Sequence, residues 1–122
     1  MNRKILIVDS DETTVDCIGA GLRKAGYEVA RAADGFEALG HMRKFKPDII
    51  LSEIDLPKLD GLDFAMALRA KPETTDIPVI FISGKTDPET LKQARGLGAR
   101  KFIEKPFDMD NLLKVVKTLL DG

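Results

Sequence analysis

Short apolar runs alternate with amphipathic stretches along the whole chain. The runs at residues 5–8, 49–51 and 79–82 are continuous and rich in β-favouring residues, which is typical of strands that are buried on both faces of a sheet. Charged residues interrupt two further runs, at 27–32 and 100–104, which favours strands near a sheet edge. Each run precedes a segment with apolar residues at helical spacing. The sequence therefore predicts five repeats of a strand followed by a helix.

Residues at the boundaries of these segments support the same interpretation. Asp11 and Asp87 each stand just before a helical pattern, where an aspartate commonly caps the helix, and Pro88 occupies the first helical position. Gly26 follows the first helical pattern and is expected to end it. The chain around Leu56-Pro57 and Asp60-Gly61 is expected to turn into the third helix.

Regular alternation of strands and helices predicts an α/β fold, with residues 1–122 forming one domain. Parallel strands joined by right-handed crossovers place helices on both faces, which gives a three-layer (βα)5 sandwich of the flavodoxin-like type. The continuous runs should form the central strands and the interrupted runs the edges, so that the predicted strand order is 2-1-3-4-5. In that order a ligand crevice lies at the carboxyl ends of the first and third strands.

Polar residues stand where four of the predicted strands end. Asp9 and Ser10 follow the first strand, Glu53 follows the third, Ser83 ends the fourth and Lys105 follows the fifth. Carboxylate oxygens are the ligands that Mg²⁺ prefers, while an ammonium and a hydroxyl group can bind phosphoryl oxygens. Each of these residue types is common in α/β loops, but their shared position at one edge of the sheet indicates a site for a cation and a phosphoryl group.

Composition narrows the possible classes of function. The 122 residues include 19 basic and 20 acidic side chains, so the broad basic surface of a nucleic-acid-binding protein is not expected. With one cysteine and one histidine, neither an internal disulfide nor a zinc site of the Cys/His type is expected. No apolar run approaches the ~20 residues that a membrane span requires. We expect a cytoplasmic protein that binds neither membranes nor nucleic acid directly.

Four stretches resemble the receiver domain of two-component response regulators: ILIVDSDE at 5–12, PDIILSEIDLPKLDG at 47–61, PVIFISG at 78–84 and FIEKPF at 102–107. The resemblance implies a phosphorelay module in which a histidine kinase phosphorylates an aspartate and Mg²⁺ assists. It assigns a role to each matching position. Asp9 and Ser10 hold the positions of a metal-binding acidic pair, Glu53 the phosphoacceptor position, Asp55 a backbone carbonyl ligand for the metal, Ser83 and Lys105 the phosphoryl contacts, and Phe102 the aromatic switch.

The resemblance also implies a surface for protein partners. In that family the fourth helix, the fifth strand and the fifth helix form the output or dimer face. The corresponding positions here include Lys92, Arg95, Arg100, Phe102 and Leu113. A homodimer through this face, or contact with a kinase or another signalling protein, is therefore expected.

Two positions depart from the receiver pattern. Glu53 stands where an aspartate is expected, and its carboxylate is ~1.5 Å farther from the backbone, a displacement large enough to matter for covalent chemistry. Ser10 removes one carboxylate from the metal site, so Mg²⁺ should bind weakly or not at all. We expect a non-enzymatic, degenerate or phosphorylation-independent receiver that signals through protein contacts. The alternative is an ordinary phosphorylatable receiver with a phosphomimetic substitution, which would explain Glu53 but not Ser10.

A second alternative arises from the same departure. The segment ILIVDSDET resembles the D-x-D-x-T nucleophile motif of haloacid-dehalogenase-type phosphohydrolases, in which Asp9 would attack phosphorus and Asp11 would be the acid/base. That superfamily places a further acidic motif on a later strand, after its lysine. No such motif follows Lys105 on a predicted strand, which counts against hydrolase activity.

Overall fold

A computed structural model describes residues 2–121 of the chain and contains the five predicted repeats. Met1 and Gly122, the ends of the expected domain, lie outside these described residues. The elements are β1 (Lys4–Val8), α1 (Glu12–Lys24), β2 (Glu28–Ala32), α2 (Gly35–Phe45), β3 (Ile49–Ser52), α3 (Gly61–Arg69), β4 (Val79–Ser83), α4 (Pro88–Gly96), β5 (Ala99–Glu104) and α5 (Met109–Asp121). Within residues 2–121, no helix has the length and apolar character needed to cross a bilayer.

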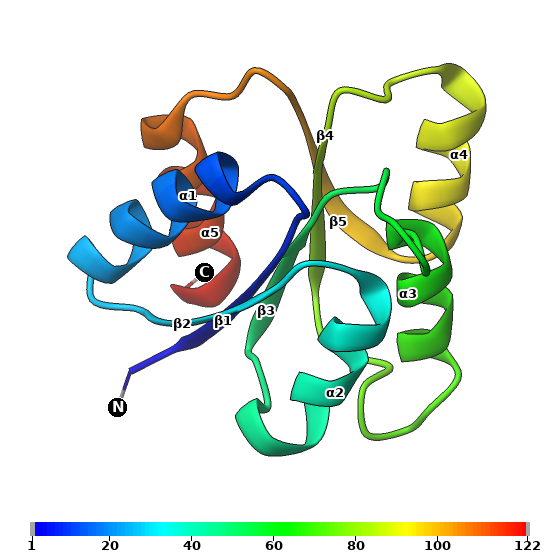
Figure 1. The fold of residues 1–122 in the computed structure, drawn as a ribbon, viewed down its shortest axis with the longest axis horizontal. Coiled ribbons are helices and arrows are strands. Elements are labelled where there is room, and N and C mark those ends of the chain that lie inside the picture. Colours follow the sequence, from blue (N-terminus) through cyan, green and yellow to red (C-terminus); the bar gives the residue numbers. More distant parts are fainter. Residues whose placement is uncertain (1, 122) are drawn as a thin grey trace.

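All five strands are parallel and lie in the order β2-β1-β3-β4-β5, which confirms the predicted topology. The register pairs Ile5 with Ile49 and Ile50 with Val79, so the apolar runs lie side by side at the centre. The charged strands β2 and β5 form the edges. Figure 1 shows α1 and α5 on one face of the sheet and α2, α3 and α4 on the other.

Alternate residues of the central strands supply two separate cores, one on each face. Ile5 and Ile7 of β1 point into the cluster with α1 and α5, whereas Leu6 and Val8 point into the cluster with α2, α3 and α4. Successive side chains of a strand face opposite sides of a sheet, so a continuous apolar run is needed to serve both. Phe64 of α3 is fully buried in the second core. The central strands therefore contribute side chains to both cores.

The helix boundaries agree with the sequence at most positions. Gly26 adopts a φ of 98°, a left-handed conformation suited to glycine, and Asp87 caps α4 by accepting a hydrogen bond from the amide of Thr90 at 3.1 Å. The prediction that Asp11 caps the first helix is confirmed for its position but not for the hydrogen bond of its side chain. Asp11 stands at the N-cap position of α1, but its carboxylate accepts from the Thr14 hydroxyl at 2.6 Å rather than from a backbone amide.

One arginine donates hydrogen bonds to three backbone carbonyl groups at the amino-terminal edge of the sheet. The guanidinium of Arg69, in the last turn of α3, donates from Nε to the Leu97 carbonyl at 2.9 Å. Its NH1 nitrogen donates to the carbonyl oxygens of Thr75 and Ile77, at 2.6 Å and 3.0 Å. Leu97 precedes β5 and Ile77 precedes β4, so Arg69 joins α3 to the segments that lead into both strands.

Candidate functional site

The carboxyl ends of β1, β3, β4 and β5 meet at one edge of the sheet and bring four of the expected site residues together. Hydrogen bonds continue past the strand ends, from the Glu53 amide to the Val8 carbonyl at 2.9 Å and from the Lys105 amide to the Ser83 carbonyl at 2.9 Å. Asp9, Glu53 and Ser83 are buried. These three side chains at the strand ends are therefore largely shielded from water.

Lys105 joins the ends of β1 and β3 through its ammonium group. Its Nζ donates to Asp9 Oδ2 at 2.8 Å and to Glu53 Oε1 at 3.0 Å. Charge-assisted hydrogen bonds of this kind are stronger than bonds between neutral groups. Lys105 follows the edge strand β5, so its side chain links the edge of the sheet to two central strands.

The remaining carboxylate oxygens accept hydrogen bonds from backbone amides. Glu53 Oε2 accepts from the amides of Ile54 and Asp55, the latter at 3.1 Å. Asp9 Oδ1 accepts from the amide of Asp11 at 2.9 Å. Every oxygen of the two carboxylates thus has a donor, which satisfies the requirement for burying a charged group.

Burial and charge pairing act in opposite directions on the pKa values of this site. Burial raises the pKa of Glu53, but the Ser83 hydroxyl and the Lys105 ammonium favour the ionised carboxylate more strongly, and the net pKa is lowered. Burial lowers the pKa of Lys105, whereas its bonds to Asp9 and Glu53 favour the ammonium, and the net pKa is raised. Glu53 and Lys105 are therefore both ionised at neutral pH.

The site depends on backbone groups that the sequence did not identify. The amides of Ile54 and Asp55 orient the Glu53 carboxylate. Gly61, which the sequence indicated only as part of a turn, donates its amide to the Ile54 carbonyl at 2.8 Å. A Cβ atom at Gly61 would collide with the carbonyl oxygen of Glu53. A glycine shortly after a polar strand end is the signal for such close backbone approach.

One of the expected metal ligands lies apart from this ion-paired group, because Ser10 is exposed. Asp55, expected to contribute its backbone carbonyl, has an exposed side chain, while its backbone amide donates to the Glu53 carboxylate. Among the residues that the structure describes, no group of three or more Asp, Glu, His or Cys side chains is arranged to hold a metal ion. A divalent cation between Asp9 and Glu53 would also meet the ammonium of Lys105, which contacts both carboxylates.

Phe102 of β5 is half-buried and lies beside the second core. Its ring packs against Phe81 of β4, with ring centroids 6.4 Å apart and an interplanar angle of 46°. This tilted arrangement is one that aromatic pairs favour. The ring therefore has a packing role in this structure, and its part as an aromatic switch stays a prediction.

Comparisons of the chain with known proteins agree on one protein family. The family model described as "Response regulator receiver domain" matches residues 5–117. The chain is 38% identical to Protein PilH of Pseudomonas aeruginosa over 120 residues, which is 98% of each chain. It spans about half the length of several curated transcriptional regulators that it also matches.

Solved structures show the same fold. A putative response regulator from Chloroflexus aurantiacus J-10-fl superposes with a TM-score of 0.93 at 34% identity, with 100% of both chains covered. The receiver domain of the sensor histidine kinase PA1611 from Pseudomonas aeruginosa gives a TM-score of 0.90 at 25% identity, again over 100% of both chains. That receiver contains a magnesium ion coordinated in its active-site cleft.

Proposed function

The chain belongs to the response regulator receiver domain family, and from this premise we propose that it is a phosphorylation-independent receiver whose acceptor position is held by an internal ion pair. Receivers are modules of phosphorelay signalling. In the receiver pattern, Lys105 and Ser83 would contact a phosphoryl group carried by the residue at position 53. Here the Glu53 carboxylate itself lies against Lys105.

The ion pair between Glu53 and Lys105, at 3.0 Å, carries the proposal. In an ordinary receiver a covalently attached phosphate adds negative charge beside this lysine, in addition to that of the neighbouring carboxylates. The longer side chain of Glu53 supplies a negative charge there without any covalent change. The conformation that depends on this contact would therefore be present in the unmodified protein.

The same contacts oppose phosphoryl transfer to Glu53. A carboxylate that attacks phosphorus needs an oxygen free to approach in line with the leaving group. Glu53 Oε1 accepts from Lys105, and Oε2 accepts from the amides of Ile54 and Asp55. These donors hold the carboxylate in its present orientation, and the extra methylene would displace the product by ~1.5 Å.

The residues present fit Mg²⁺ poorly. The cation takes hard oxygen ligands in near-octahedral geometry, and in an ordinary receiver two acids at the end of the first strand contribute to it. Here Ser10 replaces one of these acids, and the ammonium of Lys105 binds the carboxylates of Asp9 and Glu53. We propose that Mg²⁺ binds weakly, with Asp9 and the Asp55 carbonyl as its remaining ligands.

Incubation with acetyl phosphate and Mg²⁺, followed by mass spectrometry of the intact protein, tests the proposal. The unaltered protein should gain no acyl phosphate. Glu53→Asp should gain one, because its shorter carboxylate leaves room for a phosphoryl group beside Lys105. Glu53→Asp combined with Ser10→Asp should be labelled faster, since the second carboxylate restores a metal ligand.

Glu53→Gln is the matched control, because it keeps the length of the side chain but has no carboxylate to phosphorylate. Stoichiometric labelling of the unaltered protein, lost in Glu53→Gln, would contradict the proposal. Labelling that persists in Glu53→Gln would identify an acceptor elsewhere, with Asp55 as the first candidate because its side chain is exposed beside the site.

The phosphohydrolase alternative has weaker support than the receiver. Asp11 would have to act as its acid/base, but the Asp11 carboxylate is exposed and accepts a hydrogen bond from Thr14. Asp9 would have to attack phosphorus, but both of its oxygens accept hydrogen bonds, from Lys105 and from the Asp11 amide. The family match over residues 5–117 favours signalling over hydrolysis.

We propose that partners bind the face formed by α4, β5 and α5. Receivers act through contacts with histidine kinases and effector domains. Lys92, Arg95 and Arg100 are exposed on this face, whereas Phe102 and Leu113 are half-buried. If two copies associate here, light scattering should show a dimer that Arg95→Glu with Arg100→Glu converts to a monomer. A monomer for the unaltered protein at high concentration would reject self-association.

A further inference from the structure

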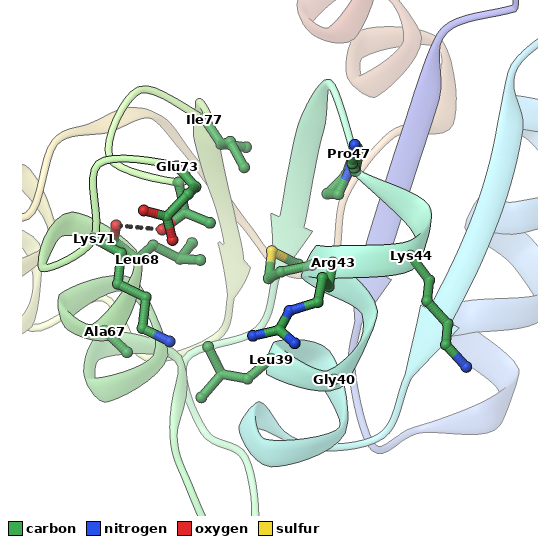
Figure 2. Close-up of a pocket in the computed structure, with 13 residues that line it drawn as sticks. Leu39, Gly40, Arg43, Lys44, Pro47, Ala67, Leu68, Lys71, Glu73 and Ile77 are labelled. Atoms are coloured by element: carbon green, nitrogen blue, oxygen red, sulfur yellow. Dashed lines mark hydrogen bonds between the residues drawn. The ribbon is translucent and has the colours of Figure 1, made fainter.

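A cavity of about 800 Å³ lies between the carboxyl-terminal ends of α2 and α3 (Figure 2). Its lining includes Pro47, which precedes β3, and Ile77, which precedes β4. The cavity therefore opens at the amino-terminal edge of the sheet, opposite to the edge that holds Asp9, Glu53 and Lys105. It is separate from the receiver site in both position and composition.

The floor of this cavity is apolar. Leu68 is fully buried, while Leu39, Met42 and Ile77 are half-buried and pack against the core on this face of the sheet. Apolar side chains that pack from below and remain open above offer a binding surface to an apolar group. The volume lies within the range of cavities that hold small organic ligands, roughly 300–1,000 Å³.

The rim of the cavity is basic. Arg43, Lys44, Lys46 and Lys71 line it, with Glu73 as the one acidic lining residue. None of these four cations forms a salt bridge with a residue in the described range 2–121. The lining therefore carries more positive than negative charge, although the chain as a whole has a net charge of −1. Such a rim raises the local concentration of anions.

The two innermost cations come from different helices. Figure 2 shows Arg43 from α2 and Lys71 from the segment after α3 extending toward each other across the cavity, whereas Lys44 points away from it. Stabilisation of the helix dipole explains basic residues in the last turn of α2, such as Arg43 and Lys44. Lys71 follows the C-cap residue of α3, Ala70, so both cations stand at helix ends, and what distinguishes them is that they converge on one cavity.

We propose that this cavity binds a small amphipathic anion. Its anionic head would lie between Arg43 and Lys71, and its apolar tail would cover Leu39, Met42 and Ile77. Charge on the rim and apolar surface on the floor together define the ligand class. A neutral apolar molecule would leave the cations without partners, and a simple inorganic anion would leave the floor exposed to water.

Three probes with the same tail and different heads test this assignment: octanoate, octylammonium and 1-octanol. Each is titrated into the ¹⁵N-labelled protein, and backbone amide shifts are followed by NMR. Octanoate should produce saturable shifts confined to residues 39–47 and 67–77. Octanol should bind about tenfold more weakly or worse, since it lacks the ionic contacts, and octylammonium should not bind.

Charge reversal supplies the matched variants. Arg43→Glu combined with Lys71→Glu should weaken octanoate binding by about tenfold or more, and both positions are exposed, so the core is unaffected. Arg23→Glu combined with Lys24→Glu changes the net charge equally on exposed positions in the last turn of α1 and should leave binding unchanged. Circular dichroism spectra should show that both double variants remain folded.

Four results would overturn the proposal. Two concern the probes: no saturable amide shifts with octanoate, or equal affinity of the protein for octanoate and octanol. The other two are an equal loss of octanoate affinity in the two double variants, and amide shifts caused by an acidic peptide when octanoate causes none. The last result would assign the surface to a protein partner. None of these readouts depends on phosphorylation at residue 53, so the receiver proposal stands or falls separately.

Discussion

Replacing Lys105 with methionine tests whether its ammonium is what allows two buried carboxylates to share one crevice. Nζ lies 2.8 Å from Asp9 Oδ2 and 3.0 Å from Glu53 Oε1. The carboxylate side chains are only 7% and 10% exposed, so water screens them poorly. Methionine keeps an unbranched side chain and removes the charge, which leaves two like charges within roughly 6 Å of each other.

The expected cost follows from Coulomb's law. Two unit charges at that separation repel by about 3 kcal/mol when the effective dielectric constant is about 20. Removing one partner of a buried ion pair typically costs about 3–5 kcal/mol. Lys105→Met should therefore lower the free energy of unfolding at pH 7 by about 3 kcal/mol.

The pH dependence of this loss distinguishes repulsion from simple loss of packing. In the unaltered protein, burial raises the pKa of Glu53, but Ser83 and Lys105 lower it overall. The ionised Glu53 carboxylate therefore stabilises the fold fully above the ordinary pKa of a glutamate, and this stabilisation is lost as the pH falls through the lowered pKa of the folded state. Burial lowers the pKa of Lys105, but Asp9 and Glu53 raise it overall. The stabilisation that the Lys105 ammonium provides is lost only as the pH rises through this raised pKa. The ion pair should contribute evenly from about pH 5 to pH 10.

Lys105→Met should behave differently. Without the ammonium, repulsion raises the pKa of one of the two carboxylates in the folded state. A proton then binds more tightly to the folded than to the unfolded protein, and the variant becomes more stable as the pH falls from 7 to 5. The difference between variant and unaltered protein should shrink over this interval.

Urea unfolding followed by circular dichroism, at several pH values between 5 and 8, measures this difference. Lys101→Met is the control, because Lys101 is an exposed lysine on β5, the strand that Lys105 follows, and undergoes the same chemical change. A loss of stability for Lys105→Met that is the same at pH 5 and pH 7, or no larger than for Lys101→Met, would refute the argument from charge repulsion.

Two further substitutions test the backbone and the amino-terminal edge of the sheet. Gly61→Ala should destabilise the protein by about 1–3 kcal/mol or more, because the new Cβ would meet the carbonyl oxygen of Glu53; Gly40→Ala, in α2 with open space around it, should instead stabilise by about 1 kcal/mol. Arg69→Met removes donors to three carbonyl groups and should cost about 2–3 kcal/mol in urea unfolding. Arg95→Met, an exposed control, should stay within about 0.5 kcal/mol of the unaltered protein.

Strand order was predictable because it depends on which strands are buried, and buried strands appear in the sequence as uninterrupted apolar runs. Only a central strand is covered on both faces, so the uninterrupted runs at Ile5, Ile49 and Val79 had to lie inside the charged strands at Glu28 and Arg100. The ends of those runs then placed the polar residues at a common edge. Apolar continuity thus separated the central strands from the edges, whereas the order among the central strands came from the flavodoxin-like pattern of alternating strands and helices.

Hydrogen-bond partners were less predictable, as the two expected capping aspartates show. Asp11 and Asp87 each have a threonine three residues later. Asp87 accepts from both the amide and the hydroxyl of Thr90, whereas Asp11 accepts only from the hydroxyl of Thr14. The amide of Asp11 is held by the carboxylate of Asp9. A local contact with the residue two positions earlier therefore accompanies this cap, and the spacing of Asp11 and Thr14 alone does not show which donor the Asp11 carboxylate accepts from.

The cavity between α2 and α3 was not predictable for a related reason. Arg43 and Lys71 belong to different repeats, and each is an ordinary basic residue near a helix end when considered alone. Their convergence depends on how two helices pack on the sheet. Local sequence indicates each helix but does not give the side-chain geometry between them.

A cationic side chain makes hydrogen bonds at each end of strand β5. These two sets of contacts affect how readily this edge strand can be exchanged between two copies of the protein. Arg69 binds the Leu97 carbonyl just before the strand, and Lys105 binds Asp9 and Glu53 just after it. An exposed edge is where β-sheet proteins swap strands or aggregate. Because β5 can leave the sheet only if both attachments break, the two cations should protect this edge against domain swapping, and Lys105 would do so as a by-product of its place in the receiver site.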